Sequence, residues 1–273
     1  MIFQADLHCH TTCSDGSLTP VQLIELAKKK GLQGLSITDH DTIAAYESAI
    51  PAAKSAGILL GTGVEFSADF EGTSVHILGY DFLLTNEELR AFCLAHQKRR
   101  QERNSAILMK LKQQKMPIEE EELEALTGTT IGRPHIAYLM LQKKYVSSIK
   151  EAFHLYLGEG KLCYAPGLPF TVQQTIDLIH KAEGKAFIAH PHLINDSKVI
   201  LALLKMNFDG IECYYARCAL EKERRWLKIA KKYNWLISGG SDYHGDLRPY
   251  SPLGCSWVDR SHFLQIFTSS LLL

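Results

Sequence analysis

Short runs rich in β-branched and apolar residues alternate with helical stretches along most of this chain, and this rhythm limits its fold more than any other feature. The helical stretches include residues 20–30, 172–182 and 220–233. Strands joined by helices build parallel sheets, because a parallel pair needs a long crossover connection. The rhythm predicts an α/β fold, in particular a βα barrel. The seven expected strands are residues 2–8, 34–39, 58–66, 74–80, 186–190, 210–214 and 235–238.

The alternation stops between residue 86 and about residue 163, where the pattern indicates helices only. We expect these helices at residues 87–114, 119–126, 134–143 and 148–157. A chain of 273 residues is long enough for one large α/β domain that carries an insertion. We therefore predict a barrel domain made of residues 1–85 and 164–273, with an inserted helical lobe at residues 86–163 over the active site.

The first helix of this predicted lobe is rich in basic residues. A solvated helix face is the favoured explanation, and contact with phosphate groups is the alternative. Lysine plus arginine and aspartate plus glutamate each total 30, so the formal net charge is zero. A neutral chain has no general field for polyanions, and duplex nucleic acid is not an expected partner. The basic residues are Lys98, Arg99, Arg100, Arg103, Lys110, Lys112 and Lys115.

The cysteine pattern and the length of the apolar runs indicate the cellular compartment of such a chain. The seven cysteines are irregularly spaced and contain no CxxC pair, which argues against a disulfide framework and a zinc ribbon. No signal peptide is visible, and no apolar run approaches the roughly 20 residues that cross a bilayer. We expect a soluble cytoplasmic protein without a membrane partner. Cys9 alternates with two histidines along a strand and is expected to be a small core residue.

Histidine or carboxylate side chains follow nearly every expected strand. His8 and His10 lie two residues apart, so both can point to the same face of the first strand. In α/β barrels, functional groups gather at the C-terminal ends of the strands. One shared metal centre explains these residues better than many separate buried polar networks. Imidazole and carboxylate together suit zinc, manganese or iron. The other candidates are Asp15, His40, Glu65, His76, His190, His192, Asp242 and His244.

Six motifs along the chain resemble those of the PHP family, named for polymerase and histidinol phosphatase. The resemblance implies a distorted (β/α)7 barrel with an inserted small helical domain. It also implies two to three divalent metal ions, with manganese expected and zinc, iron or magnesium as alternatives. The motifs are DLHCHTTCSDG at 6–16, TDHDT at 38–42, GVE at 63–65, VHILGY at 75–80, AHPH at 189–192 and SDYH at 241–244.

The family pattern assigns the ligands to three ions. Some relatives have histidine where this chain has Asp15, so Asp15 could instead contact substrate or transfer protons. Asp6, Asp39 and Asp41 are expected to orient the imidazoles. The resemblance implies one ion on His8, His10, Glu65 and Asp242, a second on Glu65, His76 and His190, and a third on Asp15, His40 and His244.

A further motif lies in the predicted lobe. Residues 131–137, IGRPHIA, resemble a substrate-contacting motif of a nucleotide-phosphatase subgroup. Arg133 could hold a phosphate bidentately, with His135 beside it at a helix N-terminus. The alternative is a helix start with proline at its first position. His192 is a candidate for phosphate contact or for protonation of the leaving group, although it could simply orient the loop of His190.

The remaining histidines lie outside all of these motifs. We expect them to be ordinary helix or surface residues. They are His96, His154, His180 and His262.

The motifs together predict a metal-dependent phosphoesterase. A metal-bridging hydroxide would attack phosphorus, with Asp15, His40 and His192 as the catalytic side chains. The favoured substrate is a small nucleotide, whose 3′-phosphate is removed from a 3′,5′-bisphosphonucleotide. The alternatives are 5′-to-3′ exonuclease action on short single-stranded RNA, hydrolysis of a metabolite such as histidinol phosphate, and a non-catalytic PHP module that stabilises a partner.

Overall fold

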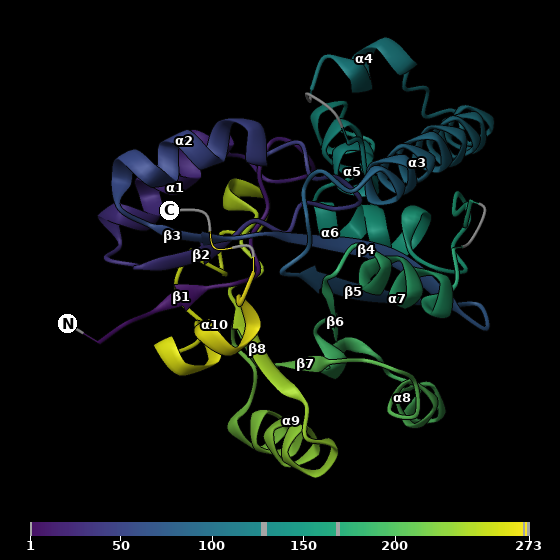
Figure 1. The fold of residues 1–273 in the computed structure, drawn as a ribbon. Helices are drawn as coiled ribbons and strands as arrows, with labels where there is room; N and C mark the ends of the chain where they lie inside the picture. The colour runs from purple at the N-terminus through teal and green to yellow at the C-terminus, as the bar shows by residue number, and fades with distance from the viewer. Residues whose placement is uncertain (1, 127–129, 168–169, 270, 272–273) are drawn as a thin grey trace.

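The computed structural model describes residues 2–126, 130–167, 170–269 and 271, and its described strands form two sheets (Figure 1). One sheet is parallel and has three strands, and the other has five in sequential order. The first contains β1 (Ala5–Asp6), β2 (Gly34–Ser36) and β3 (Leu59–Gly61). The second contains β4 (Gly63–Phe70), β5 (Thr73–Tyr80), β6 (Lys185–Ile188), β7 (Gly210–Tyr215) and β8 (Leu236–Gly240).

The expected single strand at residues 58–66 is wrong, because the chain breaks there into β3 and β4. Gly61 and Gly63 flank the break, and both are packed too closely for a side chain. A Cβ atom on Gly61 would lie 2.3 Å from the ring of Phe267. β4 then turns back on β5 through Glu71 and Gly72, which both have positive φ. Two such residues form the tight hairpin turn that suits twisted antiparallel strands.

The sheet is therefore mixed rather than a uniform βα repeat. β5 pairs antiparallel with both β4 and β6, whereas β6, β7 and β8 are parallel. Isolated bridges join the two sheets, between Cys9 and Tyr243 and between His40 and Glu65. The described strands thus form an α/β fold without one continuous closed ladder.

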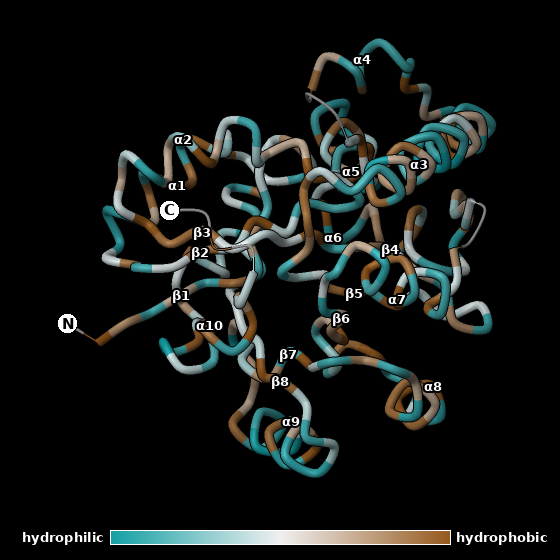
Figure 2. Tube along the Cα trace, viewed as in Figure 1, coloured by the Kyte–Doolittle hydropathy of each residue, from teal (hydrophilic) through white to brown (hydrophobic). Residues whose placement is uncertain are grey.

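Amphipathic helices cover the outside of the sheets. Thr19 begins the first of them by accepting a hydrogen bond from the backbone of Gln22, and Pro20 occupies its first turn. Figure 2 shows hydrophobic colour along the strands and hydrophilic colour over much of α3 and α9. The covering helices are α1 (Pro20–Lys29), α2 (Tyr46–Ala56), α7 (Val172–Lys181), α8 (Ser197–Leu203), α9 (Leu220–Tyr233) and α10 (Arg260–Ile266).

The helices expected between residues 86 and 163 are present, and we call residues 87–157 the helical segment. Its buried residues, including Ile107, Leu111, Ile136 and Met140, form a hydrophobic cluster of their own. The division into domains at 86–163 stays a prediction. None of the described helices is long and apolar enough to span a membrane. The segment contains α3 (Glu87–Gln113), α4 (Glu120–Glu124), α5 (Arg133–Gln142), α6 (Ile149–Ala152) and a π-helical turn (Phe153–Leu157).

A buried ion pair attaches α3 to the loop that follows β2. The Arg100 Nε and Nη2 atoms lie 2.6 and 2.5 Å from Asp41 Oδ2, and the two side chains are almost fully buried. Ser67 of β4 joins them, since its backbone N–H donates to Asp41 Oδ1. His96 Nδ1 lies 3.2 Å from the same oxygen, and His96 is completely buried. The expectation that His96 is an ordinary helix or surface residue is wrong, because its ring packs among Phe66 and other aromatic rings.

Breaking this pair from one side should destabilise the protein. Asp41→Asn leaves the buried Arg100 without its counter-charge, and we expect a loss of about 3–5 kcal/mol in the free energy of unfolding. Asparagine tolerates the left-handed backbone of Asp41, so strain should not contribute. Urea unfolding measures the change.

The exposed pair Glu122–Lys143 provides the matched control. Glu122→Gln should cost less than about 1 kcal/mol. Combining Asp41→Asn with Arg100→Met should cost less than the sum of the single changes. If the losses in unfolding free energy of the two single variants simply added up in the double variant, Asp41 and Arg100 would not be coupled.

Candidate metal centre and active site

Four residues from separate parts of the chain form the first candidate metal site. His8 and His10 follow β1, Glu65 lies in β4, and Asp242 follows β8. His10 Nε2 lies 3.2 Å from both Glu65 Oε2 and Asp242 Oδ1. His8 Nε2 lies 3.3 and 3.4 Å from the same two oxygens. All four are buried, and their ligand atoms are close enough to share one ion. They are the set that the resemblance to the PHP family implied for one ion.

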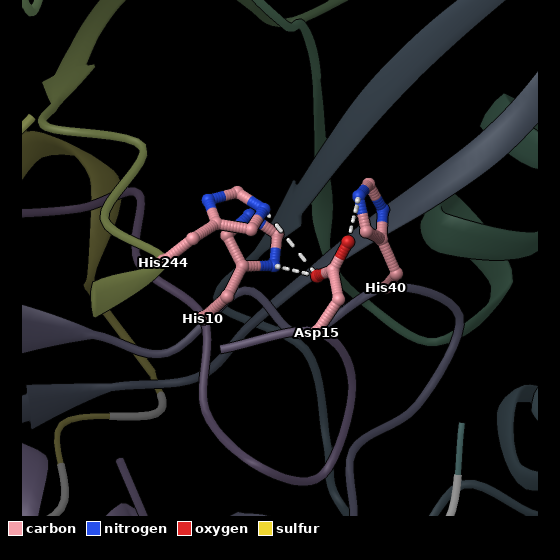
Figure 3. A group of neighbouring side chains, drawn as sticks. All are labelled: His10, Asp15, His40 and His244. Carbon is pink, nitrogen blue, oxygen red and sulfur yellow. Dashed lines mark ion pairs between the residues drawn. The ribbon is translucent and has the colours of Figure 1, made fainter. Parts of the chain in front are cut away.

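The second group consists of His10, Asp15, His40 and His244, which Figure 3 shows converging on the Asp15 carboxylate. His244 Nε2 lies 3.3 Å from Asp15 Oδ1. Burial alone would raise the pKa of Asp15, but His244 and His40 outweigh it and lower that pKa well below its usual value. The carboxylate is therefore ionised and available as a ligand.

The third group is arranged around Glu65. His40 and His76 complete it, with His76 Nδ1 2.7 Å from Glu65 Oε1. His190 Nε2 lies 2.9 Å from the same Glu65 oxygen. The predicted trio of Glu65, His76 and His190 therefore meets at Glu65, and His40 also contacts this carboxylate. How the ligands divide among ions stays a prediction.

The chemistry of these side chains fits divalent cations. Several inward-facing ligand atoms are buried without a hydrogen-bond partner: His8 Nε2, His10 Nε2, His40 Nδ1, Glu65 Oε2 and His244 Nε2. Burial alone would lower the pKa of His10, yet Asp242 and Glu65 outweigh it and raise the pKa to about 9. A cation bound here would satisfy the orphaned atoms and replace these protons.

Glu212 is a functional candidate that the sequence analysis missed. Its Oε1 lies 2.9 Å from His8 Nδ1, and its Oε2 accepts a hydrogen bond from the backbone N–H of His190. It therefore fixes the ring of one predicted ligand and the backbone of another. The sequence did contain a hint of this role. Glu212 lies inside the apolar strand Gly210–Tyr215, where a charge without a partner would be costly.

Asp6 and Asp39, which were expected to orient imidazoles, accept hydrogen bonds from the backbone and hydroxyl groups of nearby loops. Asp6 accepts hydrogen bonds from Ser241 and from the backbone of His8 and Gly254, and burial raises its pKa to about 6. Asp39 accepts from Thr11 and Ser14 instead. Asp39 reaches His10 through the Ser14 hydroxyl, whose oxygen lies 3.5 Å from His10 Nδ1, so its contact with an imidazole is indirect. Asp6 instead supplies the buried acceptor that the loops around His8 and Ser241 need.

Arg248 and Tyr215 were also missed, and both contact the outer oxygen of Asp242. The Arg248 guanidinium pairs with Asp242 Oδ2, and the Tyr215 hydroxyl donates to it at 2.7 Å. Asp242 Oδ1 meanwhile faces His8 and His10. The carboxylate is thereby fixed with one oxygen toward the metal ligands.

A pocket beside the metal ligands is lined by arginines. It includes Asp15, His40 and His76 on one side, and its lining continues through Arg99, Arg100, Arg103, Arg133, Tyr164 and Arg248. The favoured explanation of a solvated helix face is therefore wrong for Arg99, Arg100 and Arg103. They sit on the face of α3 that the Asp41 contact turns toward the sheet, whereas Lys98 is exposed.

Neither His135 nor His192 belongs to the candidate metal groups of the described residues. His135 is buried, and its Nδ1 accepts a hydrogen bond from the backbone N–H of Gly132. Burial lowers the pKa of His135. The His192 ring packs against Tyr215 at a centroid distance of 4.4 Å. Their roles in phosphate contact and proton transfer stay predictions.

Removing the charge of Glu212 should weaken metal binding. Glu212→Gln replaces one of the two acceptor oxygens with a donor NH2 group, so the side chain can no longer accept from both His8 Nδ1 and the His190 backbone. We expect metal affinity to fall about 10- to 100-fold. Titration of the metal-depleted protein with Mn²⁺ measures the change. Glu223→Gln, in α9, is the matched control, and equal affinities in both variants would contradict the role of Glu212.

Known proteins resemble this chain over nearly its whole length. The PHP domain model matches residues 6–161. A 5'-3' exoribonuclease of Haemophilus influenzae is 34% identical, over 97% of this chain and 95% of its own length. A 3',5'-nucleoside bisphosphate phosphatase of Chromobacterium violaceum is 27% identical, over 88% of this chain and 86% of its own length.

Solved structures show the same architecture. A predicted metal-dependent phosphoesterase of Bifidobacterium adolescentis superposes with a TM-score of 0.87 at 31% identity, covering 96% of this chain and 94% of its own. The converging ligands, the orphaned ligand atoms and these similarities agree. This chain belongs to the PHP domain family and is a metal-dependent phosphoesterase.

Proposed function

We propose that this enzyme hydrolyses the phosphoryl group on the 3′-oxygen of a nucleotide that carries a 5′-phosphate. In a 3′,5′-bisphosphonucleotide this reaction removes the 3′-phosphate. In short RNA with a 5′-phosphate, the same reaction releases the first nucleotide. The leaving group is the nucleoside 3′-oxygen in both cases, and only the substituent on the attacked phosphate differs.

The arginine pocket is the observation that carries this proposal. Arg100 is neutralised by Asp41 and Arg248 by Asp242. Arg99, Arg103 and Arg133 form no ion pair with a carboxylate of the described residues. Their polar contacts are neutral oxygens of Ser67, Asn104 and Leu157.

Three crowded guanidinium groups favour an anion from outside the chain. Burial, together with Arg100 and Arg133, lowers the pKa of Arg103 well below its ordinary value. Arginine stays protonated in proteins, so this shift means that its charge lacks compensation. Since the pocket also contains candidate metal ligands, it suits a substrate with one phosphate on the metals and a second on the arginines.

The side chains divide the work on such a substrate. Divalent cations, when bound, supply activated water and neutralise charge on the phosphate. Glu65 and Asp242 would hold the cations, and Arg133 would stabilise the charge that develops on the phosphate oxygens. His192 is our candidate for donating a proton to the 3′-oxygen.

The comparisons support both substrates, because one relative is named an exoribonuclease and another a bisphosphate phosphatase. Histidinol phosphate fits less well, since its ammonium group would lie against the arginines. A non-catalytic module would not need these inward-facing ligand atoms.

Removing an arginine of the pocket should lower activity mainly on substrates that carry a 5′-phosphate. Arg103→Ala in the metal-loaded enzyme should lower kcat/KM for adenosine 3′,5′-bisphosphate about 10- to 100-fold, because it deletes a charged hydrogen bond. Its effect on adenosine 3′-phosphate should be much smaller. Phosphate release measures both, and metal content should not change.

Lys98→Ala, on the exposed side of α3, is the matched control and should behave like the original enzyme. If Arg103→Ala lowered kcat/KM equally for both substrates, Arg103 would not bind the 5′-phosphate, and that part of the proposal would be wrong. Preference for histidinol phosphate, or no turnover of bisphosphonucleotides and short RNA, would overturn it.

A further inference from the structure

A second surface lies next to Asp242, and the residues that line it are different from those of the arginine pocket. Tyr215 lies at the end of β7, with its hydroxyl on Asp242. Ser67, which contacts Arg99 and Arg100, belongs to β4, three strands from β7 in the sheet order. The candidate metal ligands lie between. Tyr215, Arg217 and Trp257 line this surface, His192 packs against Tyr215, and Tyr250 lies under Arg217. We call these five residues the aromatic groove.

Aromatic rings and a cation are interleaved along this groove. The ring of His192 lies 4.4 Å from that of Tyr215. Arg217 lies over Tyr250, 5.6 Å from its centroid, and Tyr250 is 56% exposed. Exposed tyrosine faces beside arginine are the features on which bases of single-stranded nucleic acid stack.

The groove continues outward from Tyr215 as a hollow in the surface. Tyr215, Arg217 and Trp257 line it, together with Glu223 and Asp259. The two carboxylates would repel a long phosphate backbone. The hollow therefore suits one or two nucleotides rather than an extended strand.

We infer that the aromatic groove binds the nucleotides of RNA downstream of the attacked phosphate. This inference rests on the proposed function and deepens it. A substrate whose 5′-phosphate lies among the arginines and whose 3′-phosphate lies on the metals must send its next nucleotide away from the arginines. The groove next to Asp242 receives that nucleotide and stacks its base. A bisphosphonucleotide has no such nucleotide and does not use the groove.

The test compares substrates with and without downstream nucleotides. In the metal-loaded enzyme, Tyr250→Ala and Arg217→Ala should each lower the ratio of kcat/KM for a 5′-phosphorylated trinucleotide to that for adenosine 3′,5′-bisphosphate. We expect about a tenfold decrease, the effect of losing one stacked base. Tyr250→Phe keeps the ring and should keep the ratio. Tyr233→Ala, a partly exposed tyrosine of α9, is the control and should also keep it.

Binding separates this inference from the proposed function. Fluorescence anisotropy of a labelled 5′-phosphorylated trinucleotide with metal-depleted protein should show weaker binding by Tyr250→Ala and not by Tyr250→Phe. If Tyr250→Ala changed neither the ratio of kcat/KM values nor the binding of the trinucleotide, the inference that the groove binds RNA would be wrong. If the original enzyme hydrolysed neither substrate, the proposed function would fail, while the anisotropy would still decide whether the groove binds RNA.

Discussion

One buried carboxylate, that of Glu65, organises the active end of this protein. Five imidazoles approach its two oxygens, from His8, His10, His40, His76 and His190. Burial alone would raise the pKa of Glu65, but the surrounding histidines outweigh it and lower the pKa well below its usual value. The negative charge compensates for clustering so many imidazoles away from water.

The position of Glu65 depends on the break in the strand pattern. Because the chain turns at Gly61 and Gly63 and starts β4, Glu65 leaves the first sheet and enters the hairpin with β5. That hairpin brings His76 beside it, while the bridge to His40 connects it with the first sheet. A uniform series of parallel strands would have separated these groups by a helical crossover.

The parts of the site that the sequence predicted are those encoded locally. Each strand end carries its candidate ligand within a few residues, so spacing and motif were enough to name His8, His10 and Asp242 as candidates. Glu212 was missed because it contacts His8 across 204 positions of the chain. The pairing of Arg100 with Asp41 spans 59 positions and was not predicted either. The α/β class followed from the alternation of elements, whereas the antiparallel hairpin depended on tight glycine packing that periodicity does not report.

The contact between Asp41 and Arg100 also has a thermodynamic consequence. Asp41 directly follows the candidate ligand His40, and Arg100 lies on α3 together with Arg99 and Arg103 of the pocket. A cation that orders His40 would thereby favour one placement of this helix, and an anion on the helix would favour the same placement of His40. By linkage, each would raise the affinity of the other by the same factor. The enzyme would then bind a cation and an anion cooperatively, and the contact between Asp41 and Arg100 would carry part of their coupling free energy.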